Sequence, residues 1–168
     1  MILDYLKYFG IAILLFIVQV TFISYISVEM IIPDIPILLV IYMSLQRGQF
    51  FGMISGFLYG FLIDFFTGSF LGLYALTYTI AGFISGYFYE ENHAKEIFQS
   101  YFFIFIMFLS IFFSNLIFFI IFIQGMSEFD YRLLLTKYCV GSTVYTLVFG
   151  IFFMFILSRG KINKVREL

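Results

Sequence analysis

The chain has 168 residues, of which 63% are hydrophobic and 11% are charged, and its formal net charge is −1. Soluble domains carry about 25% charged residues, so this composition excludes a soluble globular protein. Together with a mean hydropathy of +1.08, it predicts an all-α integral membrane protein. A chain of this length supplies about six spans of roughly 20 residues, and we expect residues 1–168 to form a single polytopic membrane domain.

The first predicted span covers about residues 5–26 and is too long and continuous for the apolar core of a cleaved signal peptide. Gln19 is its one strongly polar interior residue, and we interpret it as a hydrogen-bond partner of a neighbouring helix rather than a ligand-binding group. The second predicted span, about residues 34–46, begins around Pro33, Asp34 and Pro36. Proline loses no hydrogen bond in a first helical turn, and aspartate accepts from the free N–H groups there, so these residues predict a helix start.

The second span is too short to cross a hydrocarbon layer of roughly 30 Å, and two arrangements fit this. If the helix continues through Arg47, the chain makes five crossings and this arginine lies near the bilayer centre. If the helix breaks there, the chain makes six crossings, and seven of the nine basic residues lie on one side, leaving Arg132 and Lys137 near the other. Cytoplasmic loops are enriched in Lys and Arg, so we favour six spans with both termini in the cytoplasm.

The third predicted span, about residues 48–66, begins the most regular pattern in the sequence, a repeat of small or acidic residues at every fourth position. Residues four apart lie on one ridge of a helix, and a ridge made of glycine is a groove that a neighbouring backbone can approach closely. We expect this groove to pack against the fourth span, with the single span of a partner protein as the alternative occupant. Small or acidic residues occupy every fourth position: Gly48, Gly52, Gly56, Gly60, Asp64, Gly68 and Gly72.

The fourth predicted span, about residues 71–89, follows a break around residues 67–70. It carries small residues on a largely aromatic background, namely Gly72, Ala75, Gly82 and Gly86. Two consecutive helices with small residues predict a tightly packed hairpin.

Three titratable residues are expected at one depth, near the outer side of the membrane: Asp34, Asp64 and Lys137. Asp64 lies near a helix C-terminus, where the dipole disfavours a negative charge. We therefore predict that it is capped or paired within the bundle by the start of the following helix, by Thr67 or by Lys137, and that it fixes the outer end of the hairpin. A proton relay through the two acids is the alternative, but a relay needs polar groups along the whole membrane path.

The remaining polar residues have ordinary interpretations. We interpret His93, in the polar loop 90–96, as part of a solvated turn rather than a metal site. The fifth predicted span, about residues 97–124, contains Asn115, a candidate for an interhelical hydrogen bond. The sixth, about residues 133–157, carries Lys137 in its first turns, where it can snorkel to the interface, and Cys139 as a small core residue. The basic C-terminal tail fits either positive-inside anchoring or weak attraction to anionic membrane lipid. With a net charge of −1 we expect no nucleic-acid partner, and we expect no cofactor and no metal.

The pattern as a whole resembles the bacterial rod shape-determining protein MreD family. The likeness covers the whole chain in its span layout, but its specific residues are concentrated within residues 33–86. These residues are Pro33, Asp34, Gly52, Gly56, Phe57, Gly60, Asp64, Gly68, Gly72, Ala75, Leu76 and Gly82.

The resemblance implies a non-enzymatic, multi-pass scaffold in the bacterial inner membrane that belongs to the cell-elongation machinery (the elongasome) and helps to organise peptidoglycan synthesis. The partners it implies are MreC, a single-span protein with an extracytoplasmic domain, together with RodA, a penicillin-binding transpeptidase and MreB filaments. It also implies a fold similar to the substrate-binding membrane subunits of ECF transporters, and a small-molecule-binding subunit of that kind is the alternative function. The chain offers few convergent polar groups for a ligand pocket, which disfavours the alternative.

Overall fold

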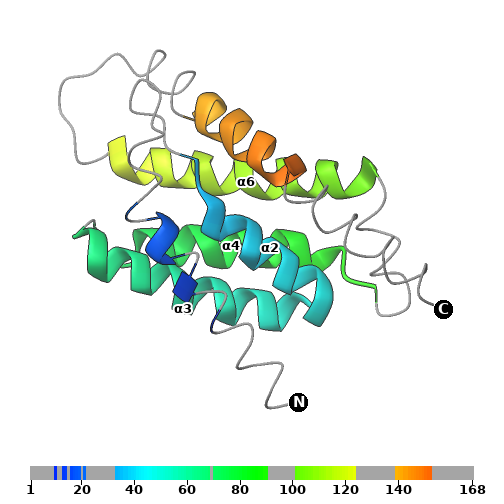
Figure 1. Cartoon of the computed structure of the whole chain (residues 1–168), viewed down its shortest axis with the longest axis horizontal. Helices are drawn as coiled ribbons and strands as arrows, with labels where there is room; N and C mark the ends of the chain where they lie inside the picture. The colour runs from blue at the N-terminus through cyan, green and yellow to red at the C-terminus, as the bar shows by residue number, and fades with distance from the viewer. Residues whose placement is uncertain are drawn as a thin grey trace.

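The computed structural model describes residues 33–68, 70–90, 101–123 and 139–152, together with residues 10, 13, 14, 16–19 and 21. These residues form helices and their turns, with no strand among them, so the all-α class is confirmed for this part of the chain. The helices are α2 (Ile35–Arg47), α3 (Gln49–Thr67), α4 (Leu73–Tyr87) and α6 (Tyr101–Ile123), followed by a helix at Gly141–Phe152, drawn in orange in Figure 1.

The chain breaks between α2 and α3, as the six-span arrangement requires. Gly48 adopts φ +93°, a conformation that side-chain-bearing residues rarely take, and its N–H donates to the Ser44 carbonyl at 2.9 Å. The next helix begins one residue later, at Gln49, and returns alongside α2 (Figure 1). A single continuous helix through Arg47 is therefore excluded.

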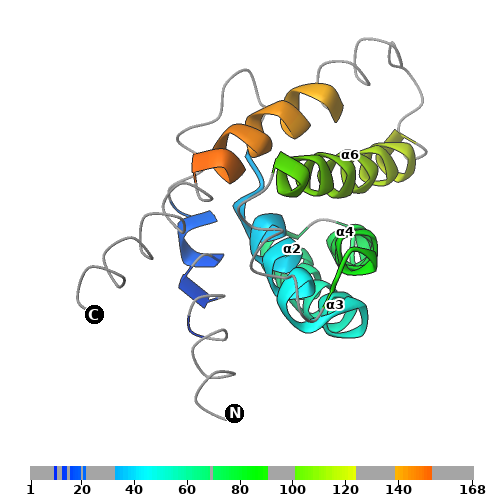
Figure 2. The same cartoon turned by 90° about the vertical axis from the view of Figure 1, so that its right-hand side faces the viewer.

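Helices α2, α3 and α4 form one group, and α6 with the Gly141–Phe152 helix lies over it as a second layer (Figure 2). α6 runs antiparallel to α4, because Tyr74 meets Phe118 with ring centroids 5.0 Å apart while Phe88 meets Phe102 at 5.6 Å. The short helix α2 supplies much of the core, since nine of its 13 residues are buried. They are Pro36, Ile37, Leu38, Leu39, Val40, Ile41, Met43, Ser44 and Leu45.

The outer surface of the bundle is strongly apolar. Along α3, Phe50 and Phe65 are 77% and 69% exposed, and Phe57 and Phe61 are about half exposed. Within the described residues, α3 and Tyr101–Phe122 of α6 are long and apolar enough to cross a membrane by length and composition. An apolar exterior of this kind suits lipid rather than water.

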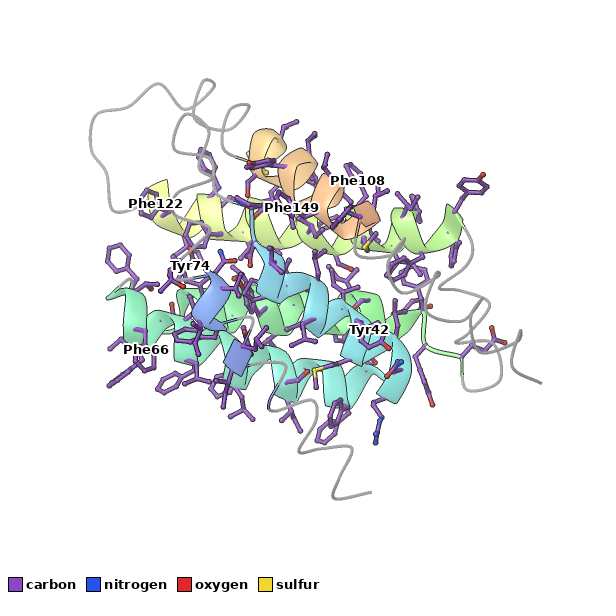
Figure 3. All side chains as sticks on the ribbon, in the orientation of Figure 1. Tyr42, Phe66, Tyr74, Phe108, Phe122 and Phe149 are labelled. Atoms are coloured by element: carbon purple, nitrogen blue, oxygen red, sulfur yellow. The ribbon has the colours of Figure 1, made fainter. Side chains whose placement is uncertain are left out.

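The two ends of the bundle differ in which helices meet there (Figure 3). The Arg47 end is where α2 meets α3, and Tyr42 lies toward it. The Asp64 end is where α3 meets α4, and Phe66 and Phe122 lie there. The predicted break at 67–70 is confirmed, because α3 ends at Thr67 and Gly68 closes it in the left-handed conformation.

Candidate functional site

The glycines of α3 form a close contact with α4. A Cβ atom built on Gly56 would lie 2.7 Å from the carbonyl carbon of Tyr78, and one built on Gly60 would lie 2.6 Å from the Cα of Ala75. Both obstacles are backbone atoms of α4, which cannot move aside as a flexible side chain can. Only glycine at these positions permits the observed approach.

The facing residues of α4 complete this interface. A Cβ atom on Gly82 would meet the backbone of Gly52, and one on Gly86 would lie 2.9 Å from the Cβ of Gln49. α2 joins the same contact, because the buried Ser44 hydroxyl donates to the carbonyl of Gly82 at 2.6 Å. The groove of α3 is therefore filled by α4, as expected for internal packing, and is not open to another helix at these positions.

Three glycines of the four-residue pattern lie outside this ridge, which corrects their assignment to the packing groove. Gly48 caps α2 and precedes α3, Gly68 caps α3, and Gly72 precedes α4 with φ +95°. A Cβ atom on Gly68 or Gly72 would meet nothing within 4 Å. These glycines are needed for positive φ at turns rather than for close helix packing.

Asp64 joins the end of α3 to the start of α4. It is fully buried, and its carboxylate accepts three backbone N–H groups at 3.0 Å, from Gly72 and Ala75 at Oδ2 and from Tyr74 at Oδ1. The first N–H groups of a helix have no intrahelical acceptor, and the positive end of the helix dipole favours an anion there. The prediction that Asp64 is capped by the following helix start is confirmed.

The Thr67 hydroxyl, the second candidate partner, donates to the carbonyl of Ile63 at 2.7 Å. Lys137, the third candidate partner, lies outside the described residues. The beginning of α4 thus offsets the unfavourable dipole at the end of α3. The carboxylate accounts for three backbone donors that would otherwise be unpaired in an apolar environment.

Asp34 organises a second polar cluster, at the start of α2. Its Oδ1 accepts the N–H of Ile37 at 3.4 Å, which confirms its predicted role as the helix cap, and also accepts the hydroxyl of Tyr78 from α4. Its own N–H donates to the Thr146 hydroxyl at 3.0 Å. The Asp34 cluster, defined as Gln19, Asp34, Tyr78 and Thr146, therefore joins four segments of the chain.

Gln19 belongs to this cluster through two bonds to the chain around Asp34. Its Nε2 donates to the carbonyl of Pro33 at 3.1 Å, and its Oε1 accepts the N–H of Ile35 at 3.3 Å. The interpretation of Gln19 as an interhelical hydrogen-bonding residue is confirmed. Gln19 thus pairs the Pro33 carbonyl and the Ile35 N–H, two backbone groups at the start of α2 that have no helical hydrogen-bond partner.

The two acids are held by neighbouring turns of one helix, as their expected common depth requires. Tyr74 and Tyr78 are one turn apart on α4 and meet edge to face, with ring centroids 5.9 Å apart. The first gives its backbone N–H to Asp64, and the second gives its hydroxyl to Asp34. Asp34 and Asp64 therefore lie toward the same end of the bundle.

Comparison with known proteins gives one match. The family model for the rod shape-determining protein MreD matches residues 2–159 of the 168 residues. The chain belongs to the MreD family. Curated proteins and solved structures yield no match.

MreD proteins are membrane-associated, shape-determining structural proteins, and the family is not known for enzymatic activity. Membership therefore implies a role in rod shape determination. The geometry of this MreD chain agrees with a structural role, because the polar residues described above hold helices together. In the part of the chain that is described, no group of three or more His, Cys, Asp or Glu residues could hold a metal ion.

Several polar contacts between helices were not identified from the sequence of this MreD chain. Ser44, Tyr78 and Thr146 are single hydroxyl residues in apolar segments, and no spacing distinguishes them from residues that face lipid. Ser114 of α6, which donates to the Thr77 carbonyl at 2.8 Å, gives no sequence signal either. The hydroxyls alone identify candidate donors, but only the helix packing selects their acceptors.

Asn115 was identified correctly as an interhelical residue. Its Nδ2 donates to the hydroxyl of Thr143 at 3.0 Å, which ties α6 to the Gly141–Phe152 helix. Cys139 is buried, as expected of a small core residue. His93 lies outside the described residues.

Proposed function

We propose that this protein is a non-enzymatic membrane scaffold of the cell-elongation machinery that binds an MreC-like single-span protein and helps to organise peptidoglycan synthesis. The observation that carries the proposal is the family match over residues 2–159. The helix contacts add physical support. A bundle tied by close glycine packing and buried polar contacts is suited to holding partners in a fixed arrangement.

The proposed topology is six crossings in one domain over residues 1–168, within the bacterial inner membrane and with both termini in the cytoplasm. The break at Gly48 supports it, because two helices joined there cross in opposite directions. The distribution of Lys and Arg supports the orientation, since seven of nine fall on the cytoplasmic side in this arrangement.

The proposed partners are an MreC-like protein first, and through it RodA, a penicillin-binding transpeptidase and MreB. Because α4 fills the glycine groove, a partner helix must use another surface of the bundle. Residues Gly52, Gly56, Gly60 and Asp64 would then act indirectly, by keeping α3 and α4 in register beneath that surface. Lys137 remains a proposed interfacial residue of the last span.

The experiment that tests this function is affinity purification of the tagged protein from its native membranes in mild detergent, followed by mass spectrometry. The expected result is recovery of an MreC-like protein and cell-wall synthesis enzymes above the amounts found with an untagged strain. A tagged, unrelated multi-pass protein expressed at the same level controls for detergent-resistant membrane fragments. Recovery of a paired-ATPase energising module without elongation proteins would refute the scaffold and identify a transporter subunit instead.

A further inference from the structure

The helix lengths place Asp34 below the surface of the hydrocarbon layer. α3 has 19 residues and α2 has 13, which correspond to about 28 Å and about 20 Å at roughly 1.5 Å per residue. The two helices meet at Gly48, so their Arg47 ends are level. If α3 crosses a layer of roughly 30 Å, the start of α2 lies about 10 Å short of the opposite surface.

The contacts with α4 give the same depth by an independent route. The Tyr78 hydroxyl reaches Asp34, and nine residues, or about 14 Å of helix, separate Tyr78 from the end of α4 at Tyr87. That end adjoins the Arg47 end, since a Cβ atom on Gly48 would touch the Tyr89 ring at 3.4 Å. Asp34 is therefore roughly 14 Å from the Arg47 end along α4 and roughly 20 Å along α2.

The two carboxylates at this depth are surrounded differently. Both oxygens of the fully buried Asp64 accept backbone N–H groups. In Asp34, Oδ1 accepts both of the bonds that the described residues donate, and Oδ2 accepts none from them. Asp34 is also partly exposed, whereas the α2 residues that follow it from Pro36 to Ile41 are buried.

We propose that water reaches the Asp34 carboxylate inside the hydrocarbon layer, from the side of the membrane opposite Arg47. A carboxylate oxygen that accepts no hydrogen bond from the described residues is strongly disfavoured in contact with lipid, and water reaching it would supply the hydrogen bonds. Access from the Arg47 side is closed by the buried apolar residues of α2. The inference rests on the proposed topology, but not on the proposed partner.

The test is cysteine labelling in spheroplasts with a membrane-impermeant cationic methanethiosulfonate. Cys139 is the one cysteine of the sequence, so Cys139→Ser provides the background. In this Cys139→Ser background, Asp34→Cys is compared with Leu62→Cys. Leu62 lies about 20 Å from the start of α3, which is the same depth as Asp34, but its side chain is 41% exposed on the outside of the bundle. An apolar environment disfavours the reactive thiolate, so we expect Asp34→Cys to be labelled roughly tenfold faster or more.

Further variants keep the test decisive. Ile35→Cys retains Asp34 and reports on the same position if loss of the helix cap prevents folding. Arg166→Cys reports orientation, and we expect its labelling only after the membrane is permeabilised. Faster labelling of position 34 or 35 than of Leu62→Cys, from the side opposite Arg166→Cys, supports the inference. The inference is overturned if positions 34 and 35 are not labelled, if Leu62→Cys is labelled equally fast, or if labelling comes from the Arg166 side. Labelling of Arg166→Cys from outside the intact spheroplasts refutes the proposed orientation by itself.

Discussion

Replacing Gly56 with alanine adds one methyl group where the backbones of α3 and α4 are in close contact. The new Cβ atom would lie 2.7 Å from the carbonyl carbon of Tyr78 and 3.1 Å from the backbone nitrogen of Thr79. The carbonyl oxygen of Tyr78 would lie nearer still, and ordinary contact begins at 3.4 Å, so the two helices must separate locally by at least about 0.7 Å. Neither obstacle is a side chain that can change rotamer.

The cost follows from this separation. Alanine gains about 1 kcal/mol over glycine from helix propensity, while forcing a methyl group into a packed interface costs about 1 to 3 kcal/mol. If the separation extends two turns to Asp64, its bonds to α4 lengthen from 3.0 Å to about 3.7 Å or more, beyond hydrogen-bonding distance. We therefore expect Gly56→Ala to lower the free energy of unfolding by about 2 kcal/mol.

The assay is thermal unfolding of the purified protein in one detergent, followed by size-exclusion chromatography of the fraction that remains folded. Gly10→Ala is the matched control, because Gly10 is helical and a Cβ atom there would meet nothing within 4 Å. We expect the control to be as stable as the wild type, or more so. A Gly56→Ala protein as stable as the Gly10→Ala protein would refute the reasoning.

Three other predictions use the same assay. Asp64→Asn replaces one carboxylate oxygen with an NH₂ group that cannot accept, and should destabilise by about 1 to 3 kcal/mol; an unchanged unfolding temperature would mean that these bonds contribute nothing. Ser44→Ala removes the bond to α4 and should cost about 1 kcal/mol, whereas Ser55→Ala, whose hydroxyl bonds within α3, should cost less; the reverse order would contradict the assigned interface. A double-mutant cycle of Asn115→Ala and Thr143→Ala should give a coupling energy of about 0.6 to 1.7 kcal/mol, and additive effects would show that their contact is not stabilising.

Much of the local structure could be predicted from the sequence. Pro36 and Asp34 define the start of α2, because a proline suits a first turn and an aspartate caps it wherever the helix lies. The distribution of charge favoured a break at Arg47, and Gly48 provides it. The cap of Asp64 could be anticipated because a buried carboxylate at an unfavourable helix end requires donors from nearby.

The repeat of small residues shows the limit of such reasoning. A spacing of four predicts one ridge only while the helix continues, and α3 ends at Thr67. Gly68 and Gly72 keep the spacing but lie beyond this end, where backbone conformation rather than packing requires glycine. The assignment to the packing groove is therefore correct for Gly52, Gly56 and Gly60. It is wrong for Gly68 and Gly72, which follow the end of α3, and for Gly48, which precedes its start.

The sequence by itself determined the composition, the approximate helical segments in the described ranges and the residues that begin α2 and separate it from α3. These features depend on side chains acting on their own backbone or on the surrounding solvent, so they can be recognised locally. Only the tertiary structure decided that α4 fills the groove of α3, and that Tyr78 and Thr146 converge on Asp34. In a chain this apolar, almost any helix face can meet lipid or protein, and backbone fit between small residues selects which faces meet.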